Sequence, residues 1–207
     1  QPVEALLNFR ATPDMLTLRP ADANEVSGAY MIALERRHSP CVIALSRQGC
    51  NNLHGSSKEN VELGAYVLRR ADEDAATEQV PQLVLVGSGS EVQLLVQTAP
   101  ELADRARVRI VSMPCWELFD AQPMEYRMSV FPRGVPVLAV EALTPEGWCK
   151  YAHSVIGMRT FGHSGPAKEV QKKFGFTTDN VRNKAVELLD FYKSREAPCL
   201  LERPDAP

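Results

Sequence analysis

Apolar residues in the first seventy positions fall into a pattern that predicts a strand, a helix and a second strand. Residues 15–18 and 41–45 are short apolar runs, and the second contains β-branched members. Between the runs, Asp22 and Glu25 have the spacing of a helix capping box. Apolar residues then recur at the helical spacing i, i+3, i+4, i+7 and i+8: Val26, Ala29, Tyr30, Ala33 and Leu34. We therefore expect a βαβ unit with two buried parallel strands and a helix that turns this apolar stripe toward the core.

The second half of the chain repeats this pattern more fully. Residues 83–86, 108–113 and 135–140 are apolar runs that predict buried strands. A helix is expected between the first two runs, because apolar residues recur there with helical spacing: Val92, Leu95, Val96, Ala99 and Ala103. A last helix is expected to begin at Thr177, Thr178 or Asp179 and to present an apolar face of Val181, Ala185, Leu188, Leu189 and Tyr192. This half therefore predicts a three-layer α/β domain.

Charge and proline content divide the chain between these two segments. Residues 71–81 carry four acidic side chains and no basic one, so we interpret them as an acidic linker between domains.

Residues 1–70 offer too few strands and helices to cover both faces of a parallel sheet, so this segment is expected to be incomplete. Residues 82–193 form the second domain, and residues 194–207, with three prolines, are expected to be a disordered tail. The predicted fold class is α/β, with two three-layer segments and mainly parallel sheets.

Overall composition excludes several classes of protein. Of the 207 residues, 44% are hydrophobic and 24% are charged, and the formal net charge is −3. No basic excess is therefore present to bind nucleic acid. The longest apolar run, residues 135–140, is far shorter than the about 20 residues that a membrane helix needs. Five cysteines without metal-ligand spacing indicate free thiols in a reducing compartment, and we expect a cytoplasmic protein.

Two short motifs follow predicted strands and are candidate binding sites. Residues 87–90, Gly-Ser-Gly-Ser, lie where a dinucleotide-binding turn would hold phosphates, but Val92 replaces the third glycine of that fingerprint. We interpret the glycines as a tight turn and Ser90 with Gln93 as a capping box. The second motif, Ser-Arg-Gln at residues 46–48, follows the predicted strand at 41–45. Its Arg47 has the planar fork that matches a phosphate, although an exposed arginine at a loop start is the commoner interpretation on pattern.

Other polar residues offer no comparable site. The four histidines have no metal-ligand spacing, and no serine or cysteine has the surroundings of a nucleophile, so we interpret all four as structural: His38, His54, His153 and His163. Lys172 and Lys173 fall on a short helix predicted over residues 166–174, and we interpret them as a solvated face.

Several stretches, in order along the chain, resemble the C-terminal third of transketolase. They are residues 19–22 (RPAD), 44–48 (ALSRQ), 55–57 (GSS), 113–122 (MPCWELFDAQ), 161–167 (FGHSGPA) and 175–181 (GFTTDNV). The similarity extends from residue 1 to about residue 193. Residues 1–10 also resemble the second half of a family signature whose first half ends in an active-site histidine, just upstream of this sequence. The resemblance implies that residues 1–70 are the C-terminal part of a thiamine-enzyme pyrimidine-binding domain, and that residues 82–193 are the transketolase C-terminal domain.

The resemblance also implies a function. Transketolases move a two-carbon ketol unit from a ketose phosphate to an aldose phosphate, as cytoplasmic homodimers that use thiamine diphosphate and a divalent metal, Mg or Ca. Arg47 matches the family arginine that holds the terminal phosphate of the sugar, which favours a binding role for it. No catalytic, cofactor-binding or metal-binding residue of the family falls within this sequence. By itself the chain is therefore expected to be inactive and to bind no cofactor, and its expected partners are sugar phosphates and the missing N-terminal part.

The sequence departs from the family pattern in places, and other interpretations stay open. Residues 49–52 (GCNN) replace an Asn-Leu-Pro-like run, and His163 and Cys149 are unusual; none of these has an assigned role. The sequence ends without a peroxisomal tripeptide. Alternatives are deoxyxylulose-phosphate synthase, the beta subunit of a 2-oxo-acid dehydrogenase, or a non-catalytic α/β regulatory module. Residues 46–48 and 161–167 favour transketolase over the related enzymes.

Overall fold

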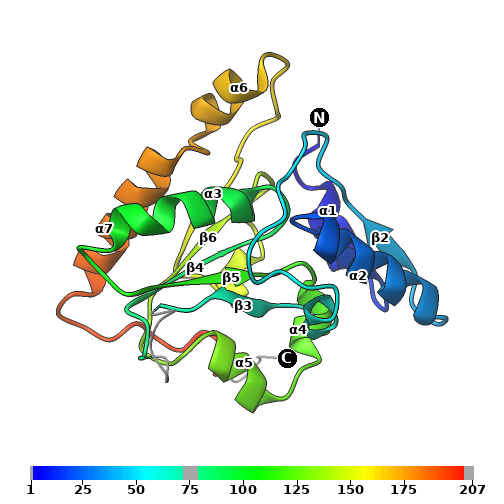
Figure 1. Cartoon of the computed structure of the whole chain (residues 1–207), viewed down its shortest axis with the longest axis horizontal. Coiled ribbons are helices and arrows are strands. Elements are labelled where there is room, and N and C mark those ends of the chain that lie inside the picture. Colours follow the sequence, from blue (N-terminus) through cyan, green and yellow to red (C-terminus); the bar gives the residue numbers. More distant parts are fainter. Residues whose placement is uncertain (1, 72–78, 203–207) are drawn as a thin grey trace.

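A computed structural model of the chain describes residues 2–71 and 79–202 and contains two parallel-stranded units (Figure 1). The helices are α1 (Ala5–Arg10), α2 (Ala23–Glu35), α3 (Glu91–Thr98), α4 (Trp116–Asp120), α5 (Met124–Val130), α6 (Ala167–Phe174) and α7 (Thr178–Tyr192), with 3-10 turns η1 (Asn60–Leu63), η2 (Ala99–Leu102) and η3 (Trp148–Lys150). The strands are β1 (Leu16–Leu18), β2 (Cys41–Ile43), β3 (Tyr66–Arg69), β4 (Leu83–Gly87), β5 (Val108–Ser112), β6 (Val137–Val140) and β7 (Ser154–Ile156). None of the described helices combines the length and apolar content that a membrane crossing requires.

The larger unit is a five-stranded sheet in the order β3-β5-β4-β6-β7, parallel except for β3. Helices α3 and α7 pack on one face, where Leu85 and Ile110 meet Leu95 and Leu188. Trp116 and Phe119 of α4 and residues of α5 cover the other face. This confirms the predicted three-layer α/β unit, with the helix–sheet–helix order that buries both faces of a parallel sheet.

The boundary between the two units lies earlier than the predicted one. Strand β3 falls before residue 70, yet it pairs antiparallel with β5, with Tyr66 opposite Ser112. The alternate residues Tyr66 and Leu68 are buried in the core on the α3/α7 face of the sheet. This packing holds β3 at the edge of the sheet. Residues 64–71 therefore belong to the second unit. Most of the predicted acidic linker, residues 72–78, lies outside the described residues.

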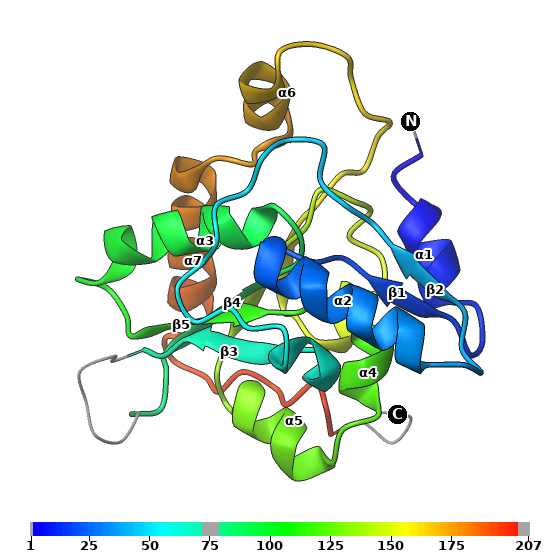
Figure 2. The ribbon, with the colours of Figure 1, turned by 45° about the vertical axis from the view of Figure 1, so that its right-hand side comes forward.

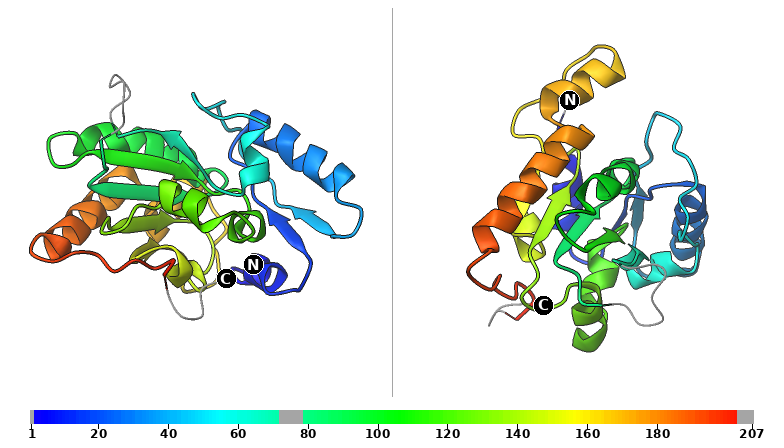
Figure 3. Two further views of the ribbon diagram at one scale, coloured as in Figure 1. Left: turned by 90° about the horizontal axis from the view of Figure 1, so that it is seen from below. Right: turned by 60° about the vertical axis from the view of Figure 1, so that its left-hand side comes forward.

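The first unit is a βαβ arrangement, as predicted, with β1 and β2 parallel. Its helix α2 begins at Asp22, whose carboxylate accepts a hydrogen bond from the Glu25 amide at 3.0 Å. The core of the unit is small and includes Cys115 and Leu118 from the second unit. Strand β2 is only half-buried, whereas a fully buried strand was expected. Both views of Figure 3 show the first unit lying at one side of the five-stranded sheet.

Helix α2 turns only part of its predicted apolar stripe toward the core: Ala29 is buried, and Val26 and Ala33 are half-buried. Its buried residues are Glu25, Gly28, Ala29 and Ile32, whereas the side chain of Leu34 is 80% exposed and that of Tyr30 is 52% exposed. The helix docks through Gly28, where a Cβ atom would lie 2.3 Å from the Lys58 carbonyl oxygen. A close approach at a glycine thus decides which face is buried, because any side chain there would hold the helix away.

The described part of the C-terminal tail is ordered, so the prediction of disorder is wrong for residues 194–202. Ala197 forms a β-bridge with Gly134, and both Ala197 and Leu201 are buried. Leu201 joins the core cluster on the α4/α5 face of the sheet. Apolar residues on both sides of Pro198 thus anchor the tail to the domain. Residues 203–207 lie outside the described part.

Candidate functional site

A groove of about 670 Å³ lies between the two units, beside the carboxyl ends of their parallel strands. Residues that follow β2, β4, β6 and β7 line it, including Arg47, Ser90, Leu143 and Met158. The arm formed by residues 162–174, with α6, is its outer wall. Figure 2 shows α6 and the loop after β2 at the same end of the molecule. Ligands of open α/β sheets bind outside the carboxyl ends of the strands, so this is the expected location for a site.

Arg47 lies on this groove with an exposed side chain, as the sequence pattern predicted. Across the groove are His163 and Ser164 of the α6 arm. Among the described residues, Arg47 has neither an ion pair nor a side-chain hydrogen bond. An uncommitted guanidinium at the edge of a groove can bind an incoming anion without first breaking a protein contact.

A buried ion cluster lies at the base of the groove. Glu141, at the end of β6 and fully buried, accepts two hydrogen bonds from Arg10, at 2.7 and 2.9 Å. Its other partners are the Ser88 hydroxyl at 2.5 Å and the Trp148 indole nitrogen at 2.8 Å. The Arg10 guanidinium also stacks 3.9 Å from the ring of Trp116. The carboxylate thus receives bidentate and neutral hydrogen bonds that satisfy both oxygens, as burial of a charge requires.

Arg19 is the second cation of this cluster. Its guanidinium contacts Glu91 at 2.6 Å and lies 3.9 Å from Glu141, and it donates to the Ser88 carbonyl oxygen at 2.5 Å. Burial by itself raises the pKa of Glu141, but the charges of Arg10 and Arg19 outweigh it and lower that pKa to about 2. Burial lowers the pKa of Arg19, but the charges of Glu91 and Glu141 raise it above its usual value. Both groups are therefore ionised at neutral pH.

The glycine-rich turn at residues 87–90 holds this arginine instead of a nucleotide phosphate. Gly89 has a φ of +58°, and a Cβ atom there would lie 2.7 Å from the Arg19 guanidinium carbon. The Gly89 amide also donates to the Arg19 carbonyl oxygen at 2.9 Å. The predicted capping box at Ser90 is wrong, because its hydroxyl donates to the Glu91 carboxylate at 2.7 Å and does not cap the helix. Residues 87–90 therefore form a tight turn, as interpreted from the sequence, and the group that this turn contacts is the guanidinium of Arg19.

The described residues do not bring metal-ligating side chains together. No group of three or more metal-ligating side chains occurs within residues 2–71 and 79–202. His163 packs against the ring of Phe174, and His153 accepts a hydrogen bond from the Val137 amide. Lys172 and Lys173 are exposed on α6, as expected of a solvated face. All five cysteines are free thiols.

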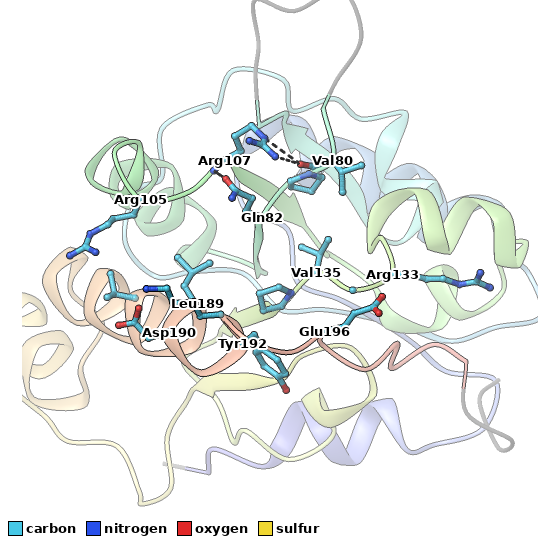
Figure 4. A pocket seen from close by; sticks show the side chains of 15 residues that line it. Val80, Gln82, Arg105, Arg107, Arg133, Val135, Leu189, Asp190, Tyr192 and Glu196 are labelled. Atoms are coloured by element: carbon cyan, nitrogen blue, oxygen red, sulfur yellow. Dashed lines mark hydrogen bonds between the residues drawn. The ribbon is translucent and has the colours of Figure 1, made fainter.

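A second hollow of about 710 Å³ lies at the opposite edge of the sheet, beside the amino ends of β4, β5 and β6 (Figure 4). Its basic residues do not converge: Arg105 and Arg133 point away from each other. Arg107 is held by the Val80 carbonyl oxygen, at 3.2 and 3.4 Å. Three of the four basic residues that line the hollow are thus dispersed or already hydrogen-bonded, and Lys193 is the fourth. The groove that contains Arg47 is therefore the better candidate site for an anion.

Sequence reasoning singled out Arg47 as a candidate but missed the ion cluster beneath the groove. Arg10 and Glu141 are 131 positions apart, and no local pattern marks either residue as buried. The available signal was the stretch Arg-Pro-Ala-Asp at residues 19–22, which contains Arg19 and carries part of the family resemblance.

Comparison with known proteins now defines the class of the chain. The family model "Transketolase, pyrimidine binding domain" matches residues 1–51, and the model "Transketolase-like TK C-terminal domain" matches residues 64–177. The second match begins just before β3, in agreement with the position of that strand in the second unit. The two matches together define a chain that joins the end of a pyrimidine-binding domain to a transketolase-like C-terminal domain. The chain belongs to the transketolase family.

Individual relatives agree with this assignment. Transketolase 1 of Saccharomyces cerevisiae is 47% identical over 194 residues, which cover 93% of this chain and 28% of that protein. The structure of transketolase from Leishmania mexicana matches 96% of this chain and 28% of its own, with 47% identity and a TM-score of 0.89. A transketolase from Pichia stipitis in complex with sedoheptulose 7-phosphate matches 99% of this chain and 29% of its own, with 40% identity and a TM-score of 0.91. The chain therefore spans less than a third of the length of these relatives.

Proposed function

We propose that this chain works as the C-terminal portion of a complete transketolase, which moves a two-carbon ketol unit from a ketose phosphate to an aldose phosphate. One observation carries the proposal: the uncommitted guanidinium of Arg47 faces a groove at the carboxyl ends of the strands. A sugar phosphate is the ligand that suits this site, because its phosphate matches the planar fork of an arginine. The Pichia stipitis relative, solved with a sugar phosphate, supports this class of substrate.

In this proposal Arg47 binds and orients the substrate. Holding the terminal phosphate fixes one end of an extended sugar, and the reacting carbonyl group then lies at a defined distance from Arg47. Thiamine diphosphate and a divalent metal, Mg or Ca, supply the carbanion chemistry in the complete enzyme. No group of three or more metal-ligating side chains occurs among the described residues. In this proposal, cofactor binding and proton transfer belong to the other parts of the complete protein.

The proposed partners are the rest of the transketolase chain and a second copy in a homodimer, in the cytoplasm. Helix α2 supports this, because Tyr30, Met31 and Leu34 leave a contiguous apolar face exposed. Such a face on a small unit with a two-stranded sheet indicates a surface that other protein covers.

The direct test is a transfer assay on the complete enzyme with its cofactors. With a ketose phosphate donor and an aldose phosphate acceptor, we expect a donor shortened by two carbons and an acceptor lengthened by two. Release of carbon dioxide from a 2-oxo acid, without this transfer, would indicate one of the related thiamine enzymes. A folded complete protein with neither activity would indicate the regulatory module.

The 207-residue chain offers a matched prediction. Calorimetric titration with thiamine diphosphate and magnesium is expected to show no binding, because the turn at residues 87–90 already holds Arg19 and no metal-ligand group lies among the described residues. The complete enzyme, titrated under the same conditions, is the positive control. A micromolar site on the short chain would contradict the proposed division of roles.

A further inference from the structure

We propose that Ser90, at the amino end of α3, is a positioning residue for Arg47 and acts through the side chain of Gln48. This inference rests on the proposed function, in which Arg47 holds the phosphate of the substrate. It adds a role for the C-terminal domain: the domain orients the substrate arginine of the other unit.

A continuous set of hydrogen bonds connects the ion cluster to the loop of Arg47. The Gln48 amide nitrogen donates to the Ser90 hydroxyl at 3.2 Å, and this hydroxyl donates to Glu91 at 2.7 Å. Glu91 is in turn held by Arg19 at 2.6 Å and by the Ala142 amide at 2.9 Å. The side chain of Glu91 is 7% exposed, so the acceptor of the serine proton has a fixed position.

The direction of these bonds follows from the chemistry of the serine. A hydroxyl has one proton, and Ser90 gives it to the Glu91 carboxylate, whose other oxygen pairs with the Arg19 guanidinium. The Ser90 oxygen is therefore left as an acceptor, and Gln48 must present its amide nitrogen. This requirement selects one orientation of the Gln48 side chain, next to Arg47 in the sequence.

The loop has few other attachments near Arg47. Arg47, Gln48 and Gly49 are exposed, and a Cβ atom at Gly49 would meet nothing within 4 Å. Among the described residues, the hydrogen bond from Gln48 to Ser90 is the one that joins residues 45–51 to another element. Removing it would free the backbone on both sides of Gln48, and ordering that backbone again on binding would weaken affinity for the phosphate.

The test is a double-mutant cycle in the complete enzyme. Ser90→Ala removes the acceptor without removing a helix cap, since the hydroxyl does not cap α3. We expect the KM for a phosphorylated aldose to rise about 3- to 10-fold with kcat unchanged, from the loss of one exposed hydrogen bond. The unphosphorylated analogue should be unaffected, and Ser90→Thr, which keeps a hydroxyl, should restore the KM. In an Arg47→Ala background, Ser90→Ala should add nothing.

Controls separate this inference from the proposed function. Ser129→Ala removes a hydroxyl that donates to the Tyr126 carbonyl oxygen on α5 and should leave both substrates unchanged. A phosphate-selective loss in Arg47→Ala together with no effect of Ser90→Ala overturns the inference and leaves the proposed function standing. If Ser90→Ala raises the KM equally for both substrates, the inference is also overturned. The same holds if Ser90→Ala raises the KM as much in the Arg47→Ala background as in the wild type. If Arg47→Ala shows no phosphate selectivity, the proposed function fails and this inference fails with it.

Discussion

Arg47→Ala is expected to lower kcat/KM of the complete enzyme for a phosphorylated aldose acceptor by about 30- to 150-fold. The physical reason is the loss of a charge-assisted contact to the phosphate, worth about 2 to 3 kcal/mol in a transition state that includes it. The unphosphorylated acceptor never makes this contact, so its kcat/KM should change little. Steady-state kinetics with the two acceptors, measured for the wild type and the variant, gives both ratios.

Two further variants sharpen this measurement. Arg47→Lys keeps the positive charge but not the planar fork, so we expect an intermediate loss on the phosphorylated acceptor. Arg182→Ala removes an exposed arginine on α7, which contacts Asp179 and the neighbouring Asn183 on the same helix, and should leave both acceptors unchanged. An equal loss on both acceptors in Arg47→Ala would assign this arginine a structural role.

Glu141→Gln is expected to lower the free energy of unfolding by about 3 to 5 kcal/mol, because it leaves the buried guanidinium of Arg10 without its counter-charge. Arg10 would keep a side chain that is 4% exposed, and its bidentate acceptor would be lost. Arg19 would retain Glu91 but lose the nearby charge of Glu141. Urea unfolding of the 207-residue chain, followed by far-ultraviolet circular dichroism, measures this change.

Glu25 provides a matched control for this prediction. It is also fully buried, but its partners are neutral: the Ala21 amide and the hydroxyl groups of Tyr66 and Ser112. Burial, the largest effect, raises the pKa of Glu25. Glu25→Gln leaves no buried cation without a partner. The expected loss in the free energy of unfolding is therefore smaller, about 1 to 2 kcal/mol. A loss in Glu25→Gln as large as that in Glu141→Gln would contradict the assigned role of the arginines.

The two carboxylates also give opposite pH dependences. The folded-state pKa of Glu141, about 2, is below its unfolded value, so its stabilisation is complete above about pH 4.5 and is lost as the pH falls toward 2. The wild type and Glu141→Gln should therefore converge in stability over this interval. The raised pKa of Glu25 acts in the other direction: its contribution is present below the unfolded pKa and is lost as pH rises through the folded pKa. A stability difference between wild type and Glu141→Gln that does not change with pH would contradict the ion cluster.

Local patterns predicted most elements of this fold. Asp22 begins α2 and Thr177 begins α7, because the side chain of an N-cap residue bonds to an amide only three positions away. The apolar runs became the parallel strands β1, β2, β4, β5 and β6, since a buried parallel strand is apolar along its length. Arg47 could be predicted as well, because its place after a strand puts it at the carboxyl edge of a sheet.

Features that depend on pairs distant in the sequence could not be predicted in this way. Strand β3 joined the second sheet because its hydrogen-bonding partner, β5, lies about forty residues further on. Helix α2 is rotated so that Tyr30 and Leu34 of its predicted stripe are exposed, because Gly28 fits against the Lys58 carbonyl group. Helical periodicity does not report such a shape match. The tail is ordered because Leu201 finds an apolar cluster formed by α4 and α5.

The candidate site likewise combines features that neighbouring residues predict with contacts between residues distant in the sequence. The sequence by itself determined the class of the chain, its strands and helices, and Arg47 as a phosphate-binding candidate, because each rests on neighbouring residues or on a family pattern. Only the tertiary structure decided that Arg19 occupies the glycine-rich turn, that Glu141 neutralises Arg10, and that Ser90 holds Gln48. These contacts join two units across many tens of residues, and their energies depend on burial and exact geometry, which exist only once both units have folded together.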